Sequence, residues 1–275
     1  MENAGLQEFE SEQKQLLEAI QVKTGYDFRN YSEASVKRRL VQAMSQMGCK
    51  TLSALQEKVL RDGKGFDDLL QFLTVPVSEM FRDPSYFLAL RQNVMPILQT
   101  YPSIKVWVAG CSTGEEVYSL AILLQEEDLL DRTILYATDI NPRSLEAAER
   151  GVYAVDRIQK FTHGYQLSGG KRSLSDYYTA AFDSVKFDKS LLKNITFANH
   201  SLVTDSVFSE THLISCRNVL IYFNRELQNR VFELFKESLC RKGFLGIGSK
   251  ETLRFSQEEK YFSTFENAER IYQKL

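Results

Sequence analysis

The sequence is poor in the residues that build metal centres and disulfide frameworks. Its 275 residues include only three histidines, four cysteines and one tryptophan. The cysteines contain no C-x-x-C pair, and no histidine stands at metal-ligand spacing from a cysteine or another histidine. We therefore expect reduced thiols, as is usual in the cytoplasm, with no structural disulfide and no metal site.

A long apolar run and a strong excess of one charge are also missing. The net charge is -2 and the isoelectric point is about 6.0, whereas a nucleic-acid-binding domain usually carries a basic balance. No stretch approaches the length of a membrane span, and no apolar signal segment opens the chain. With 43% hydrophobic and 25% charged residues, the composition favours a cytoplasmic globular protein of one large or two smaller domains.

The first 75 residues have the hydrophobic spacing of helices throughout. Apolar residues recur at intervals of three and four, and Thr51 is a plausible N-cap for a helix that Gly63 stops. Pro76 then breaks the pattern. We predict an all-helical N-terminal domain over residues 1–75.

From residue 104 onward, short apolar runs alternate with helical patterns. This alternation predicts an α/β domain with a doubly wound, mainly parallel sheet over residues 76–275. The helices are expected over 116–130, from Asn141-Pro142 onward, and over 225–240. The expected strands are 104–109, 134–138, 195–198, 212–216 and 244–248, with a closing hairpin at 261–265 and 270–272.

Residues from about 151 to 194 interrupt the alternation. They are rich in glycine and tyrosine, and the run from Val185 to Asp188 alternates at period two. A connection of this length usually carries its own structure or a function. We predict a small antiparallel inserted β-subdomain whose free edge could accept a peptide strand; a lid that binds no partner fits equally well.

The segment Gly110-Cys-Ser-Thr-Gly114 joins the first strand to a helix, which is where α/β sheets bind nucleotide-like cofactors. Ser112 stands where the G-x-G-x-x-G fingerprint needs glycine. Glu115 and Glu116 at the helix start repel phosphate and suit a cation such as S-adenosylmethionine, although they could merely complement the helix dipole. Asp139, which closes the second strand, suits ribose hydroxyls better than a simple cap.

Four motifs together resemble the CheR family of S-adenosylmethionine-dependent chemotaxis receptor methyltransferases. They are the runs 77–84, 109–119, 137–141 and 216–223, in that order along the chain. The resemblance implies a helical N-terminal domain, a class I methyltransferase domain and an inserted β-subdomain, which are the parts that the pattern predicts.

The resemblance also implies which residues form the site. Arg82 and Tyr222 are candidates for orienting the carboxylate of the substrate that receives the methyl group. The resemblance implies no metal. The implied cofactor contacts are Ser78, Arg82, Gly110, Glu116, Asp139, Ser201, Leu202, Arg217 and Asn218. The chain departs from the family pattern at Pro76 and Ser201, where asparagine is usual, and at His212, where aspartate is common. We therefore expect altered cofactor binding on an unchanged fold.

The implied reaction is methylation of glutamate side chains in the cytoplasmic region of a chemoreceptor, which gives glutamyl methyl esters and S-adenosylhomocysteine. The run Lys37-Arg38-Arg39 could dock an acidic receptor helix, although a solvated face is the commoner explanation of such a run. A non-catalytic S-adenosylmethionine-binding adaptor is the alternative function. A nucleic-acid methyltransferase is disfavoured, because the charge is near neutral and no Asn-Pro-Pro-aromatic motif follows the fourth strand.

Overall fold

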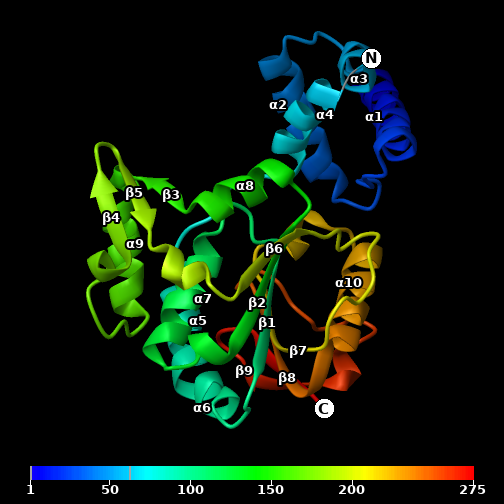
Figure 1. Ribbon diagram of the computed structural model, residues 1–275. Coiled ribbons are helices and arrows are strands. Elements are labelled where there is room, and N and C mark those ends of the chain that lie inside the picture. Colours follow the sequence, from blue (N-terminus) through cyan, green and yellow to red (C-terminus); the bar gives the residue numbers. More distant parts are fainter. Residues whose placement is uncertain (1, 62) are drawn as a thin grey trace. The chain divides into compact units, whose positions relative to one another are not determined.

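The protein consists of two compact units, described here from a computed structural model that covers residues 2–61 and 63–275 (Figure 1). One unit contains Met1–Val75 together with Ile221–Arg230. The other contains Pro76–Leu220 together with Val231–Leu275. We refer to them as the helical unit and the sheet unit.

The helical unit confirms the predicted helical pattern. Its helices are α1 (Glu2–Thr24), α2 (Glu33–Met47), α3 (Leu52–Arg61) and α4 (Gly63–Leu73). The Thr51 hydroxyl accepts the N–H of Ala54 at 3.1 Å, as expected of an N-cap. The helices share one core, whose fully buried members include Leu16, Ile20, Leu40, Leu55 and Leu69.

A segment distant in sequence completes the helical unit. It contains Tyr222, the last residue of the short helix η6 (Leu220–Tyr222), and the start of α10 (Arg225–Ser238). The carbonyl of Tyr222 accepts the N–H of Ser32 at 2.7 Å, and the rings of Tyr31 and Phe223 meet edge to face at 5.0 Å. Contacts between segments this far apart in sequence cannot be predicted from the spacing of hydrophobic residues.

The sheet unit is built on a seven-stranded sheet of order β6-β2-β1-β7-β8-β10-β9. The first five strands in this order run parallel, whereas β10 is antiparallel to both of its neighbours. This confirms the predicted mainly parallel sheet with a closing hairpin. The strands are β1 (Ile104–Ala109), β2 (Thr133–Asp139), β6 (Ile195–Asn199), β7 (Thr211–Cys216), β8 (Leu239–Ile247), β9 (Phe262–Glu266) and β10 (Ile271–Lys274).

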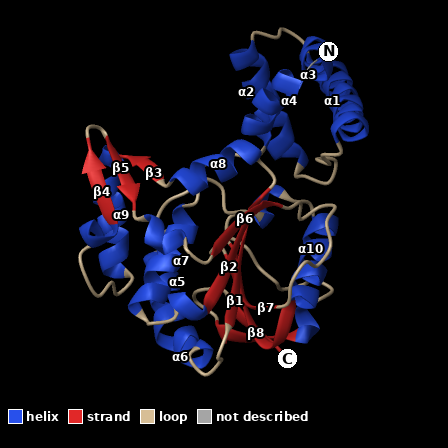
Figure 2. Ribbon diagram, viewed as in Figure 1, coloured by secondary structure: helices blue, strands red, loops and turns tan. Residues whose placement is uncertain are grey.

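Helices cover both faces of the sheet, as Figure 2 shows for α7 (Glu115–Glu126) on one side and α10 on the other. The predicted helix 116–130 is too long. It ends at Glu126, because Asp128 adopts a left-handed conformation with φ 56°. The connection after β2 is α8 (Pro142–Arg150), for which the Asn141 side chain accepts the N–H of Arg143 at 3.1 Å.

The segment before β1 is helical, which the sequence pattern did not reveal. It comprises α5 (Pro84–Ala89), the π-helix η1 (Leu90–Val94) and α6 (Met95–Leu98).

The predicted insert is a separate three-stranded antiparallel sheet of order β3-β5-β4 (Figure 1). Its strands are β3 (Val152–Ala154), β4 (Tyr178–Ala181) and β5 (Ser184–Phe187), and it also contains the short helix η3 (Val155–Arg157) and α9 (Ile158–Leu167). β3 and β4 are its edges. The side chains of β4 are mostly exposed.

A buried ionic cluster connects the insert to α7 and η1. Glu126, at the end of α7, accepts hydrogen bonds from Arg91 at 2.7 Å, from Tyr177 at 2.9 Å and from Tyr165 at 2.5 Å. Burial raises the pKa of Glu126, but these donors outweigh it and hold the pKa below its ordinary value. Arg91 also pairs with Glu127 at 2.5 Å.

We expect Arg91→Met to destabilise the sheet unit by about 3–5 kcal/mol, because it leaves a buried carboxylate without its cation. Trp107, the single tryptophan, is buried in β1 and reports unfolding of this unit by fluorescence during a urea titration. The control is Lys171→Met. Lys171 pairs with Glu127 at 2.9 Å but is half exposed, so the loss should stay below about 1 kcal/mol. Equal losses in the free energy of unfolding of both variants would show that the buried pairing of Arg91 contributes no more than an exposed ion pair.

Candidate functional site

The turn after β1 requires its glycines. Gly110 and Gly114 have φ values of 76° and 92°. A Cβ atom on Gly110 would lie 2.5 Å from a methyl group of Val219, and one on Gly114 would lie 2.8 Å from the Cβ of Ala148. The N–H groups of Gly110 and Cys111 both donate to the carbonyl of Thr138 at 2.8 Å, so the turn is fixed against the end of β2.

Asp139 stands beside this turn. Its carboxylate accepts the N–H of Ser112 at 2.8 Å and the N–H of Asn141 at 2.9 Å. Burial raises the pKa of Asp139, and the backbone hydrogen bonds oppose that shift. A carboxylate accepts about four hydrogen bonds. Asp139 therefore retains acceptor capacity for the hydroxyls of a ribose.

Ser112 adds a second indication of a ligand. It has φ 51°, and its buried hydroxyl has no hydrogen-bond partner within the described part of the chain. A strained residue with an unsatisfied buried polar atom is uncommon outside functional sites. The turn and Asp139 fit a nucleoside at the carboxyl ends of β1 and β2, and β1 also borders β7, which is where the strand order reverses.

The two glutamates at the start of α7 are not free. Glu116 accepts from Ser215 at 2.7 Å and from Arg217 at 3.2 Å. Glu115 is fully buried and pairs with Arg157 at 2.8 Å. Glu115 thus has Arg157 as its partner, whereas Glu116 shares Arg217 with Asp83, so the pairing lessens but does not cancel the negative charge at the start of this helix.

Arg217, at the end of β7, organises the segment before α5. Its side chain is only 1% exposed and stacks on Tyr86, 4.2 Å from the ring centroid. It donates to Asp83 at 2.7 Å and to the carbonyl of Arg82 at 2.8 Å. The predicted residues Arg82, Glu116 and Arg217 thus lie together, with Arg217 engaged by protein groups.

Asn218 follows in a left-handed conformation with φ 61°. Its N–H donates to the carboxylate of Glu251 at 3.0 Å, and the same oxygen accepts the N–H of Gly248 at 2.6 Å. Glu251 was not predicted. It lies on a loop after β8, and nothing in its local sequence distinguishes it from other loop acids.

The departures from the family pattern have local structural roles. The Ser201 hydroxyl accepts the N–H groups of Val203 at 3.2 Å and Thr204 at 3.3 Å, so it stabilises its own turn, and Leu202 is buried. Nδ1 of His212 accepts the N–H of Lys105 at 3.0 Å, and burial lowers the pKa of this histidine.

A cavity of about 440 Å³ lies beside the turn and contains Ser78 among its lining residues. The insert contributes Tyr153 and Arg157, neither of which was predicted. Tyr153 donates to the carbonyl of Thr113 at 2.8 Å. The full lining is Pro76, Val77, Ser78, Thr113, Glu115, Ala147, Val152, Tyr153, Ala154 and Arg157.

Tyr222 groups with the helical unit, where its carbonyl accepts the N–H of Ser32 at 2.7 Å.

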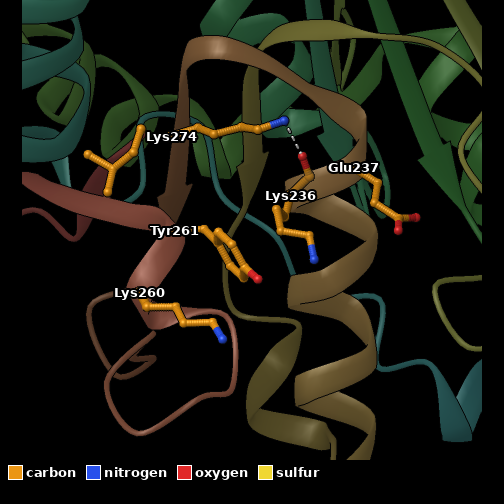
Figure 3. Close-up of a pocket in the computed structure, with 6 residues that line it drawn as sticks. Lys236, Glu237, Lys260, Tyr261 and Lys274 are labelled. Carbon is orange, nitrogen blue, oxygen red and sulfur yellow. Dashed lines mark hydrogen bonds between the residues drawn. The ribbon is translucent and has the colours of Figure 1, made fainter.

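A second cavity, of about 290 Å³, lies at α10 and the terminal strands and is rich in lysine (Figure 3). Two of its three lysines have structural partners. Lys274 donates to the carbonyls of Lys236 at 2.7 Å and Leu239 at 2.5 Å, so it caps α10, and Lys236 pairs with Glu258 at 2.7 Å. We assign no ligand to this cavity.

Within residues 2–61 and 63–275, no group of three His, Cys, Asp or Glu side chains is arranged to hold a metal ion. The helices in these ranges also include none that is both long and apolar enough to cross a membrane.

Comparison with known families matches both parts of the chain. The family description "CheR methyltransferase, all-alpha domain" matches residues 11–74, and "CheR methyltransferase, SAM binding domain" matches residues 76–271. These matches agree with the resemblance seen in the sequence and with S-adenosylmethionine as the cofactor.

Individual proteins agree with the family match. The chain is 59% identical to "Putative methyltransferase Cher3" of Pseudomonas putida, over 94% of this chain and 95% of that protein. It is 31% identical to a "Chemotaxis protein methyltransferase" of Listeria monocytogenes, over 83% and 85% of the two chains. It is also 28% identical to a 104.1 kDa uncharacterised protein of Rhodobacter capsulatus, of which it spans only 27%.

We expect Asp139→Ala to weaken binding of S-adenosylhomocysteine by about 1–3 kcal/mol, because ribose hydroxyls lose their acceptor. In the parent protein, affinity should fall as the pH falls through the raised pKa of Asp139. The loss therefore begins above the ordinary value of 3.8, since protonation removes acceptor capacity. Calorimetric titrations from neutral to acid pH measure both effects. A parent-like affinity in the Ala variant would show that the cofactor site is misplaced.

Proposed function

The chain belongs to the CheR methyltransferase family, and on that premise we propose that it methylates glutamate side chains of a chemoreceptor to give glutamyl methyl esters. The match to the S-adenosylmethionine-binding domain over residues 76–271 carries the proposal. Relatives named chemotaxis protein methyltransferase support the choice of a chemoreceptor as substrate.

The proposed chemistry needs no general base. A glutamate has an ordinary pKa of about 4.3 and is already ionised near neutral pH. S-adenosylmethionine, when bound, supplies an electrophilic methyl group. The work of the protein is then to place the carboxylate in line with that methyl group and to exclude water.

The site residues divide by task. Asp139 is proposed to hold the ribose, and the turn from Gly110 to Gly114 to admit the cofactor close to the backbone. Ser78, Arg82, Glu116, Ser201, Leu202, Arg217 and Asn218 are the further proposed cofactor contacts. The observed bonds of Arg217 indicate that it also acts indirectly, by fixing the backbone of Arg82. Arg82 and Tyr222 are proposed to orient the carboxylate.

Transfer of labelled methyl from S-adenosylmethionine to receptor-enriched membranes tests the function. Label that base releases indicates an ester. Cofactor binding without any transfer would instead support the non-catalytic adaptor. Label that resists base would point to another acceptor group and would overturn the glutamate assignment.

We expect Arg82→Ala and Tyr222→Phe to lower turnover more than cofactor affinity, because both side chains are proposed to act on the incoming carboxylate, which meets the transferring methyl group only in the reacting complex. The observed hydrogen bonds of Arg82 to Arg217 and of Tyr222 to Ser32 use backbone carbonyls, so neither substitution removes them. Turnover numbers and calorimetric affinities for both variants make the comparison. Parent rates in both would reject the catalytic assignment.

The proposed receptor-docking face on α2 is narrower than the sequence suggests. Of Lys37, Arg38 and Arg39, only Arg38 is exposed, whereas the other two are half-buried. Lys37 lies over the ring of Phe9 at 5.3 Å, and Arg39 donates to Gln42 at 3.4 Å. The free β4 edge of the insert is a second proposed contact, for an extended receptor segment.

Arg38→Glu should therefore raise the apparent KM for receptor at low salt and leave affinity for the cofactor unchanged, because exposed charges act mainly on association and are screened by salt. Lys50→Glu, an exposed reversal in the loop after α2, is the matched control. Kinetics at several salt concentrations measure the effect. The docking role fails if both reversals change KM alike or neither does.

A further inference from the structure

Arg157 joins three segments that are far apart in sequence. It ends η3 in the insert, and its Nη1 lies 2.8 Å from the carboxylate of Glu115 at the start of α7. Its Nη2 donates to the carbonyl of Ser78 at 2.6 Å. One guanidinium therefore bridges the insert, the first residue of α7 and the segment that precedes α5.

The surroundings of Arg157 hold it in place. The guanidinium lies 4.8 Å from the ring centroid of Phe161 and 5.7 Å from that of Tyr153. Its partner Glu115 is fully buried, whereas the Arg157 side chain is 36% exposed. Arg157 and Ser78 both line the 440 Å³ cavity. The bridge is thus rigid on its protein side and open on its cavity side.

The segment held by this bridge has an unfavourable backbone. Phe81 and Asp83 have φ values of 50° and 54°, although neither is glycine. Such conformations persist only where neighbours enforce them. The N–H of Phe81 donates to Ser119 at 2.9 Å, and Arg217 binds the carbonyl of Arg82 at its other end. Arg157 supplies the fixed point at Ser78.

We propose that Arg157 is a positioning residue, which sets the segment from Ser78 to Arg82 against the cofactor turn. The proposal rests on the function proposed above, since these two segments carry proposed cofactor contacts. Arg157 belongs to the insert, so the insert takes part in shaping the cofactor site.

The two bonds of Arg157 can be separated by substitution. A lysine keeps the positive charge for Glu115 but lacks the planar fork that reaches two acceptors at once. Arg157→Lys therefore loses the bond to Ser78 while Glu115 stays paired. Arg157→Gln removes the charge and leaves Glu115 buried without a cation.

Lys160 provides a matched control, because it links the same two parts of the chain. Lys160 in α9 pairs with Glu79 at 2.6 Å, and its side chain is 72% exposed. Exposed pairs contribute little. Lys160→Gln removes a link between the insert and the segment before α5 without touching the cavity.

The test measures three quantities for each variant: urea unfolding by Trp107 fluorescence, calorimetric affinity for S-adenosylhomocysteine, and methyl transfer. For Arg157→Lys we expect a parent-like unfolding midpoint with affinity for S-adenosylhomocysteine and kcat/KM each lowered by about tenfold, because small displacements of positioning groups are costly. Lys160→Gln should match the parent in all three. The double variant Glu115→Gln with Arg157→Gln should unfold at a higher urea concentration than Arg157→Gln alone. Its affinity for S-adenosylhomocysteine should be as low as that of Arg157→Gln.

Parent-like binding by Arg157→Lys would overturn the proposal, as would recovery of affinity in the double variant, because either result reduces Arg157 to a counterion of Glu115. Absence of methyl transfer by the parent protein would defeat the proposed function alone. The binding and unfolding measurements would still decide the role of Arg157, since neither depends on turnover.

Discussion

The buried guanidinium of Arg217 is the interaction on which the site depends. It stands at the end of β7 and reaches both the start of α7, through Glu116, and the start of α5, through Asp83. A buried arginine is costly unless its donors are satisfied. Here the stacking on Tyr86 and the hydrogen bonds of both Nη groups offset much of that cost, whereas Nε has no hydrogen-bond partner among the described residues. The central strand thereby dictates the path of the segment that leads into α5.

The carboxylates of the site all have partners, but their negative charge is not fully balanced. Glu115 pairs with Arg157, whereas Arg217 is shared between Glu116 and Asp83, and Asp139 is held by neutral backbone N–H groups. The carboxylates therefore outnumber the guanidinium groups that pair with them. This excess of negative charge favours a sulfonium cofactor over a phosphorylated one, and the shape of the turn, which closely packed glycines define, adds to the selection.

Features that depend on neighbours in sequence could be predicted, and those that depend on distant contacts could not. The turn at Gly110 and the position of Asp139 follow from the sequence because a strand, a glycine turn and a helix are consecutive. The mainly parallel sheet follows from the alternation. Arg157 and Glu251 could not be found in this way, because each acts on a segment more than thirty residues distant and nothing local marks either residue. The grouping of Tyr222 with the helical unit has the same origin.

The insert has a different relation to the cofactor turn from the one that its sequence suggests. Its period-two pattern and free edge indicate a peptide-binding sheet, which concerns β4. The opposite edge strand, β3, leads through Tyr153 to the carbonyl of Thr113, and η3 leads through Arg157 to Glu115 and Ser78. The two edges of the insert therefore have different surroundings. The side chains of β4 are mostly exposed, whereas β3 lies beside the groups that fix the turn after β1.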